Sequence, residues 1–107
     1  MKKQCATITC KDGTTLSVQA SSFHYCSPKN DEGPYTQVEV GFPSAAPTGK
    51  LKEYGDGSGL GQESEVYGYV PWDAVYEFIF EEHGGIVDGE LPPIKESLLV
   101  KIVSAFG

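Results

Sequence analysis

The N-terminal part of the chain contains a β-hairpin whose register is restricted by its own hydrophobic pattern. Two runs rich in Thr, Val and Ile, residues 4–10 and 14–25, flank a Lys-Asp-Gly turn. A three-residue loop, with Gly13 in the left-handed conformation, pairs Ile8 with Leu16. A loop of two or four residues would put these two side chains on opposite faces. The three-residue loop gathers one apolar face, which we predict to be Ala6, Ile8, Cys10, Leu16, Val18 and Ala20.

Two further strands are predicted by the alternation of apolar and polar side chains. Residues 35–42 form the first of them. Its apolar side consists of Thr36, Val38, Val40 and Phe42. Residues 65–70 form the second, and the two-residue period puts Tyr67 and Tyr69 on one face. Between them lies a long irregular stretch rich in Gly and Pro, residues 44–64, and loops of this length are usually functional or mobile.

The clearest helix of the chain spans residues 71–83. Proline suits its first position, and a His-Gly-Gly sequence ends it with a cation-capable side chain and a left-handed cap. Three-and-four spacing puts Val75, Phe78 and Ile79 on one apolar face. An adjacent aromatic stripe consists of Trp72, Tyr76, Phe80 and His83. A helix with so wide an apolar surface covers more than one neighbouring layer.

These elements predict an α+β fold in a single domain, residues 1–107. An antiparallel sheet of about four strands packs on the 71–83 helix and on a C-terminal segment. In that segment, residues 94–106, apolar side chains recur at helical spacing, although the pattern also permits a strand. We predict a helix there. Because the helices come late in the chain, a doubly wound parallel sheet is disfavoured.

Negative charge is concentrated in the second half of the chain. Between Glu53 and Glu90 there are ten carboxylates and no Lys or Arg, in a protein of net charge −7. Such a surface repels phosphates and attracts cations or basic protein surfaces. We therefore predict no direct binding of nucleic acid. The same run is a candidate docking surface for a basic protein partner, or a mimic of nucleic-acid phosphates.

The three cysteines indicate a reducing compartment. Cys5, Cys10 and Cys26 are too few for a disulfide framework, and their spacing matches no zinc template. The hairpin register places Cys10 toward the core and Cys5 toward solvent. The N-terminal residues lack the apolar run of a secretory signal, and no apolar window is long enough to span a bilayer. We predict a cytoplasmic protein that does not bind membranes.

Three patterns that resemble chemical sites lack necessary parts. The glycines from Gly55 to Gly61 alternate, so they lack the spacing of a dinucleotide-binding loop. His24 and Cys26 lie on a predicted strand end and face one side, but no orienting group lies near them in sequence. With Cys10 across the sheet they would supply three soft metal ligands, a pattern rarer than buried cysteine. We therefore predict no metal, no cofactor and no catalytic residue.

The aromatic stripe of the main helix supports the first functional hypothesis. Its side chains either pack on the C-terminal segment or form an interface, since aromatic anchors dominate interfaces. We predict a non-enzymatic interaction module that forms a homodimer through Trp72, Tyr76, Phe80 and His83. The alternative is a small-ligand-binding or enzymatic domain, with a pocket between sheet and helix that residues 44–64 gate. The lining of this pocket would consist of Tyr67, Tyr69, Trp72, His24 and Cys26.

The small size, the absence of Arg and the passage from Tyr67-Gly-Tyr-Val-Pro-Trp72 into Glu82-His-Gly-Gly85 characterise this chain. In these features it resembles the small orphan proteins encoded in mobile integron gene cassettes. The resemblance implies a compact α+β domain, often self-associating, with an unassigned accessory role. It assigns no function to any single residue.

Overall fold

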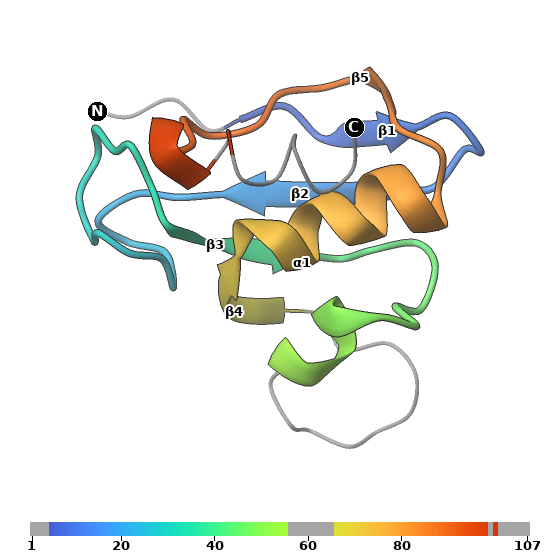
Figure 1. Cartoon of the computed structure of the whole chain (residues 1–107), viewed down its shortest axis with the longest axis horizontal. Helices are drawn as coiled ribbons and strands as arrows, with labels where there is room; N and C mark the ends of the chain where they lie inside the picture. The colour runs from blue at the N-terminus through green and yellow to red at the C-terminus, as the bar shows by residue number, and fades with distance from the viewer. Residues whose placement is uncertain (1–4, 56–65, 99, 101–107) are drawn as a thin grey trace.

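The computed structural model describes residues 5–55, 66–98 and 100, and these form an antiparallel sheet with one main helix. The five strands in this part of the chain are β1 (Ile8–Cys10), β2 (Thr15–Gln19), β3 (Gln37–Gly41), β4 (Val66–Pro71) and β5 (Ile86–Asp88). Their order across the sheet is β4-β3-β2-β1-β5 (Figure 1). The predicted α+β class is confirmed, with one strand more than predicted. β5 escapes prediction because its three residues are too few to show an alternating pattern.

The β1–β2 hairpin has the predicted register. Ile8 pairs with Leu16, and the three-residue loop closes with a 2.7 Å hydrogen bond from Cys10 N to Thr14 O. Gly13 adopts the left-handed conformation, with a φ of +95°. The buried face of the hairpin consists of Ile8, Cys10, Leu16, Val18 and Ala20. The hydrophobic pattern of the two strands is therefore sufficient to set their register.

Ala6 is the exception on this face, because it is exposed rather than buried. β1 begins only at Ile8, and the residues before it bond to side chains instead of to the β2 backbone. Cys5 N donates to Gln19 Oε1 at 2.9 Å, and Gln19 Nε2 donates to Cys5 O at 2.8 Å. Ala6 O accepts a hydrogen bond from Glu90 N at 3.3 Å. These bonds satisfy the backbone outside the ladder, so Ala6 does not continue the inward face.

The second predicted strand, residues 14–25, ends at Gln19. Beyond it, side-chain bonds to the backbone replace the ladder, and Phe23 N donates to Ser21 Oγ at 3.0 Å. Short polar side chains compete with secondary structure in this way. Residues 20–26 therefore form a loop rather than the end of a strand.

β3 shows the predicted alternation, but it ends at Gly41. Val38 and Val40 are fully buried, whereas Phe42 is 67% exposed. At Phe42 the backbone enters the left-handed region, with a φ of +51°, and the chain leaves the sheet. The prediction that Phe42 shares the inward face with Val38 and Val40 is therefore wrong.

The main helix lies across one face of the sheet (Figure 1). It consists of α1 (Trp72–Tyr76) and a π-helical continuation, η2 (Glu77–Glu82), which confirms the predicted helix 71–83 apart from its end residues. Gly84 and Gly85 follow with φ values of +88° and +109°, so the helix ends in the predicted left-handed conformation. The buried face of the helix consists of Trp72, Ala74, Val75, Phe78 and Ile79.

The C-terminal segment joins the sheet next to the start of β3. Ile94 forms a parallel bridge with Tyr35, and Lys95 N donates to Tyr35 O at 3.1 Å. A helical turn follows at residues 96–98. Residues 99 and 101–106 of the predicted C-terminal helix lie outside the described residues. No helix in the described part of the chain is long and apolar enough to cross a bilayer.

The predicted irregular stretch, residues 44–64, contains one short 3₁₀ helix in its described part, η1 (Lys50–Tyr54). Leu51 of η1 is fully buried. η1 contacts β4 and lies beside it (Figure 1). Residues 56–64 of the stretch lie outside the described residues. The predicted gate over a pocket therefore stays a prediction.

Candidate functional site

A β-bulge in β4 interrupts its pairing with β3. Val40 pairs with Tyr67 and Val38 pairs with Val70, so β4 contains one residue more than β3 between the two pairs. The extra residue lies in the Gly68–Tyr69 segment. Tyr69 has a φ of +51°, a conformation that bulky residues rarely adopt.

The bulge changes the predicted faces of β4. Because of the extra residue, Tyr67 and Val70 both face the core and are buried. Tyr69 points away from the core and is 43% exposed. The prediction that Tyr67 and Tyr69 share a face is therefore wrong, since the two-residue period holds only in a regular strand. The bulge presents one tyrosine at the surface and keeps the other in the core.

The neighbouring loop, residues 20–26, holds Tyr69 in this conformation. Tyr69 N donates to Tyr25 O at 2.9 Å, and the two ring centroids lie 6.0 Å apart. Tyr25 N donates in turn to Glu39 Oε2 of β3 at 3.2 Å. Gly68 permits this close approach, because a Cβ atom at Gly68 would lie 3.1 Å from Tyr25 Cβ. These contacts offset the backbone strain at Tyr69, which is on the order of 1–3 kcal/mol.

η1 supplies a further wall next to the bulge. Gly55, directly after η1, forms an antiparallel bridge with Tyr67 at the outer edge of β4. This bridge brings Tyr54 beside the same edge. The resulting groove has a volume of about 530 Å³. We call it the tyrosine groove, and its described lining consists of Tyr25, Tyr54, Gly55, Val66, Gly68 and Tyr69.

The described lining of the tyrosine groove is aromatic and uncharged. Three tyrosines contribute to it, and it contains no carboxylate, lysine or histidine. Aromatic walls with a few polar groups are typical of binding sites. The titratable groups of the described lining are the three tyrosine hydroxyls.

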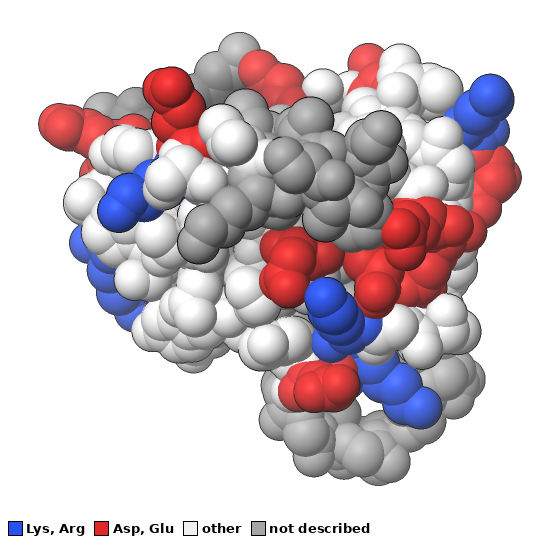
Figure 2. All heavy atoms as spheres, in the orientation of Figure 1, with Lys and Arg blue, Asp and Glu red and all other residues white. Residues whose placement is uncertain are grey.

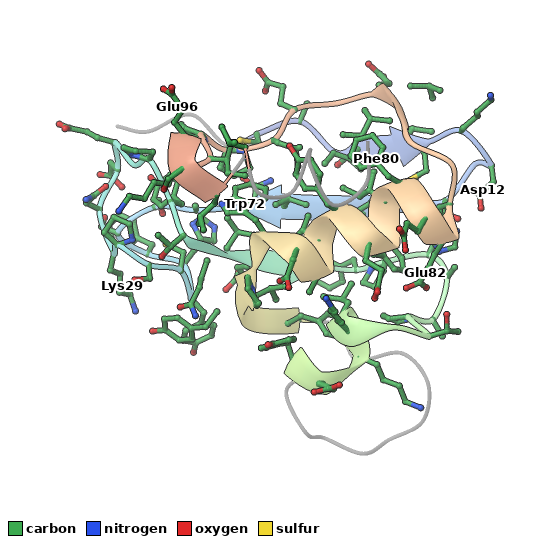
Figure 3. All side chains as sticks on the ribbon, viewed as in Figure 1. Asp12, Lys29, Trp72, Phe80, Glu82 and Glu96 are labelled. Carbon is green, nitrogen blue, oxygen red and sulfur yellow. The ribbon has the colours of Figure 1, made fainter. Side chains whose placement is uncertain are left out.

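A lysine of the protein itself lies over one wall of the groove. Lys29 Nζ lies 5.4 Å from the centroid of the Tyr25 ring, within the range of a cation–π contact. Tyr25 is 54% exposed, so this contact forms at the surface. Figure 3 shows Lys29 at the end of the molecule opposite to Asp12. The Tyr25 ring therefore already accepts a cation.

The structure separates the aromatic residues that were predicted to line a pocket. Tyr69 lies in the tyrosine groove, whereas Tyr67 is buried on the core side of β4. Trp72 is 1% exposed, and its Nε1 donates to Tyr35 O at 2.8 Å inside the core. Tyr67 and Trp72 help to fill the space between sheet and helix, where the pocket was predicted. The groove lies instead at the edge of the sheet.

His24 and Cys26 lie around Ser21 in the 20–26 loop. Ser21 Oγ forms a 2.6 Å hydrogen bond with His24 Nδ1, and Cys26 Sγ donates to Ser21 O at 3.1 Å. Cys26 is buried and His24 is half-buried. The prediction that strand geometry puts them on one face is wrong, because the strand ends at Gln19. Within the described ranges, no three His, Cys, Asp or Glu side chains are placed to hold a metal ion.

The predicted interface stripe divides between core and surface. Trp72 lies in the core, whereas Phe80, toward the other end of the helix, is 42% exposed (Figure 3). The Tyr76 ring lies 6.1 Å from that of Trp72 and 5.1 Å from that of Phe80, so the stripe is continuous. Burial raises the pKa of the Tyr76 hydroxyl. Only the Tyr76–Phe80 end of the stripe reaches the surface, and its role as an interface stays a prediction.

His83 connects the end of the main helix to the β1–β2 turn. Its Nδ1 lies 2.7 Å from Asp12 Oδ2 and 3.0 Å from Thr14 Oγ1. Phe78 packs edge-on against the imidazole ring at a centroid distance of 4.5 Å. Hydrogen bonds from His83 and Thr14 lower the pKa of Asp12 to about 2. Through these contacts His83 connects the main helix to the β1–β2 hairpin.

Some carboxylates of the acidic run form hydrogen bonds or ion pairs within the protein. Glu77 Oε1 accepts from Lys50 N at 2.6 Å, and Glu82 Oε1 accepts from Thr48 Oγ1 at 2.8 Å. Lys50 Nζ lies 3.3 Å from Asp73 Oδ2. Figure 2 shows acidic side chains gathered around a lysine on this face of the molecule. Three carboxylates of the run lie outside the described residues: Asp56, Glu63 and Glu65.

Two walls of the groove, Tyr25 and Tyr54, carry no signal in the sequence. Tyr25 lies in a predicted strand and Tyr54 in a predicted irregular stretch, so neither is marked by a motif. The bulge has one signal, Gly68, since an isolated glycine in a strand pattern is typical of a bulge or a close backbone approach. Tyr25 contacts β4 although the two segments lie far apart in sequence. The periodicity of either segment does not predict such a contact.

Comparisons of the chain with protein-family models, with curated proteins and with solved structures give no match. The resemblance to cassette-encoded proteins therefore stays a prediction. An α+β fold does not assign a function by itself, because one fold serves many functions. A functional assignment for this chain rests on the geometry and chemistry of its site.

Proposed function

We propose that this protein is a non-enzymatic interaction module that binds a basic segment of a protein partner through the tyrosine groove. The observation that carries this proposal is the bulge, which holds Tyr69 exposed and strained beside Tyr25 and Tyr54. Bulges and strained residues concentrate at functional sites. Tyrosine rings also supply large, rigid contact surfaces at a low entropic cost.

Charge complementarity supports a basic partner. The net charge of −7 attracts a positive segment, and exposed charges act over about 8 Å at physiological ionic strength. Two carboxylates stand next to the groove walls. Glu39 bonds to the backbone of Tyr25, and the exposed Glu53 precedes Tyr54 in η1. In this proposal the carboxylates attract the partner, and the aromatic walls make the contact.

A defined basic peptide tests the proposal. Fluorescence anisotropy would measure the affinity of a labelled lysine-rich peptide for the wild type and for Tyr25→Ser. We expect the variant to bind about tenfold more weakly, because it removes one aromatic anchor. Phe42→Ser is the matched control, since Phe42 is also an exposed aromatic but does not line the groove. Unchanged binding by Tyr25→Ser, or an equal loss in both variants, would contradict the proposal.

Self-association through the exposed end of the helix stripe is a second candidate function. Phe80 is exposed although its ring packs, tilted, against that of Tyr76, and an exposed aromatic pair suits the centre of a symmetric interface. Sedimentation velocity would compare the wild type with Phe80→Ser over a range of concentrations. We expect a wild-type dimer that the substitution dissociates, while Val87→Ser, at another exposed apolar residue, leaves it intact. A wild type that is monomeric throughout removes this candidate.

The thiols bear on the proposed location of the protein. Cys10 and Cys26 are buried, free thiols, and Cys5 is half-buried. Burial, with a smaller effect of the Asp12 charge, raises the pKa of the Cys10 thiol and so disfavours the reactive thiolate. Free thiols suit a reducing compartment, which supports the proposal that the protein acts in the cytoplasm.

A further inference from the structure

The second half of the main helix, η2, is π-helical. In a π-helix the backbone hydrogen bonds join residues five apart, instead of four apart as in an α-helix. Glu77 and Glu82 are five residues apart, so this winding brings their side chains to one side of the helix. That side faces the chain that leads into η1 (Figure 3). Short π-helical segments are frequent at functional sites.

Both carboxylates accept hydrogen bonds from residues 48–50, the segment that leads into η1. Glu77 Oε1 accepts from Lys50 N at 2.6 Å. Glu82 Oε1 accepts from Thr48 N at 3.2 Å and from Thr48 Oγ1 at 2.8 Å. Hydrogen bonds to a charged acceptor are stronger than bonds between neutral groups. The two glutamates therefore hold the segment on both sides of Gly49.

The same two carboxylates fill the space beside Gly49. A Cβ atom on this residue would collide with Glu77 Oε1 and would lie 2.7 Å from Glu82 Oε2. Glu82 Oε2 is buried and has no hydrogen-bond partner among the described residues. A buried acceptor without a partner is costly, and two carboxylates that meet at one glycine repel each other. Arrangements that cost stability concentrate where they serve function.

The 48–50 segment determines where η1 begins, and η1 carries one wall of the tyrosine groove. Lys50 is the first residue of η1, and its Nζ also lies 3.3 Å from Asp73 Oδ2 of the main helix. Leu51 is fully buried, and η1 contacts both the main helix and β4. Tyr54, the last residue of η1, and Gly55 line the groove. Contacts made by the main helix therefore reach this wall through one short helix.

From these contacts we infer that Glu77 and Glu82 are positioning residues of the tyrosine groove. They fix the 48–50 segment on the π-helical turn, and η1 transmits its position to the wall formed by Tyr54. The inference rests on the proposed function and adds how the same site is regulated, through the main helix. Because coupling between two sites is reciprocal, a peptide bound in the groove stabilises the bonds to the 48–50 segment in turn.

Alanine and glutamine variants test the role of these bonds. Glu77→Ala removes the acceptor for Lys50 N, whereas Glu77→Gln removes the charge but keeps an amide oxygen as acceptor. Glu82→Ala and Glu82→Gln make the same comparison at Thr48. Glu81→Ala and Glu81→Gln are the matched controls, because Glu81 is an exposed carboxylate of the same π-helical turn. All six variants lose one negative charge.

Fluorescence anisotropy with the lysine-rich peptide measures the effect on binding. We expect Glu77→Ala and Glu82→Ala each to bind about fivefold more weakly than Glu81→Ala. The Glu77→Gln and Glu82→Gln variants should bind within about twofold of Glu81→Gln. Equal affinities of the three alanine variants would show an effect of net charge alone and would overturn the inference. Glutamine variants as weak as the alanine variants would also overturn it, since the acceptor would then not matter.

Amide hydrogen exchange of the full-length protein tests the transmission without any ligand. In Glu77→Ala we expect exchange at Lys50 and at Gly55 to become about tenfold faster, while Val18 in the core of β2 keeps its protection. Faster exchange at Lys50 with unchanged exchange at Gly55 would show that η1 does not transmit the position, and would overturn the inference. A wild type that does not bind the peptide contradicts the proposed function instead. The two failures are therefore distinguishable.

Gly49→Ala tests the same contact without a change in charge. The added methyl group takes the space of the carboxylates, so we expect affinity for the peptide to fall about fivefold, as in Glu77→Ala. The double variant Gly49→Ala/Glu77→Ala should lose no more than about the larger single loss, because both substitutions disturb one contact. Fully additive losses would show that Gly49 and Glu77 act independently, which would overturn the inference.

Discussion

The β1–β2 hairpin and the β4 strand belong to one antiparallel sheet, but their geometries have different origins. In the hairpin the partner strands are neighbours in sequence, and their hydrophobic pattern selects one register. β4 pairs with β3 across a long connection in the sequence. An extra residue in β4 breaks the alternation of buried and exposed side chains, and the backbone at this bulge bonds to the 20–26 loop. The local pattern is thus decisive where pairing is local. The candidate site forms where distant contacts override that pattern.

The two regions also differ in how they use the left-handed conformation. The hairpin places glycine there, at Gly13, where positive φ carries no Cβ penalty. The bulge places Tyr69 there, at a cost on the order of 1–3 kcal/mol. Phe42, at the end of β3, shares the φ of +51° and the exposure. Backbone strain alone therefore does not mark a binding site, and what distinguishes Tyr69 from Phe42 is its place in the described lining of the tyrosine groove.

The largest expected effect tests the hairpin register. Leu16→Ala removes a buried side chain opposite Ile8 and is expected to lower the free energy of unfolding by about 2–5 kcal/mol. Ser17→Ala, on the opposite face, removes only the hydrogen bond from Gln19 Nε2 to Ser17 Oγ and is expected to lower it by about 1 kcal/mol or less. Urea denaturation of both variants measures the difference. Equal losses would mean that the strand is not held in this register.

The same contrast shows how much of the protein is predictable from its sequence. The hairpin register, the main helix and the α+β class follow from local periodicity, turn chemistry and caps. The ends of β2 and β3 do not follow from the sequence pattern. Ser21 Oγ accepts a hydrogen bond from the local backbone after β2, and the left-handed conformation of Phe42 directs the chain away from the sheet after β3. Of the groove, sequence predicts only Tyr69. Tyr25 and Tyr54 reach it through packing between distant segments.

Substitutions at two glycines separate the steric cost of an added methyl group from the conformational cost of a positive φ. Gly68→Ala puts a methyl group 3.1 Å from Tyr25 Cβ and is expected to cost about 1–3 kcal/mol of stability, because the loop must move. The same substitution should weaken binding of the basic peptide by widening the groove. Gly13→Ala has no atom within 4 Å of its methyl group but requires a φ of +95°, so it should cost about 1–2 kcal/mol. If Gly13→Ala also weakened binding of the basic peptide, the hairpin turn and the β4 bulge would not be independent.

Tyr69→Gly separates strain from binding. The substitution removes the positive-φ strain, about 1–3 kcal/mol, but loses the ring contact with Tyr25 and adds chain entropy, so we expect a net stability change below about 1 kcal/mol. Affinity for the basic peptide should fall about tenfold. Phe42→Gly is the matched control, with the same φ and an exposed ring outside the groove. Similar losses of affinity in both variants would show that Tyr69 at the bulge does not contribute more to binding than Phe42 at the end of β3.

At the hairpin end, Asp12→Asn should have the smallest effect, and this effect should depend on pH. Hydrogen bonds from His83 and Thr14 lower the folded-state pKa of Asp12 from 3.8 to about 2. The carboxylate therefore stabilises the fold above the unfolded pKa, and this contribution is lost as the pH falls toward 2. Urea denaturation should show a destabilised variant at about pH 6 and little difference near pH 2. Asp88→Asn on β5 is the control. If Asp12→Asn were equally destabilising at both pH values, the Asp12 charge would not be what ties the hairpin to His83.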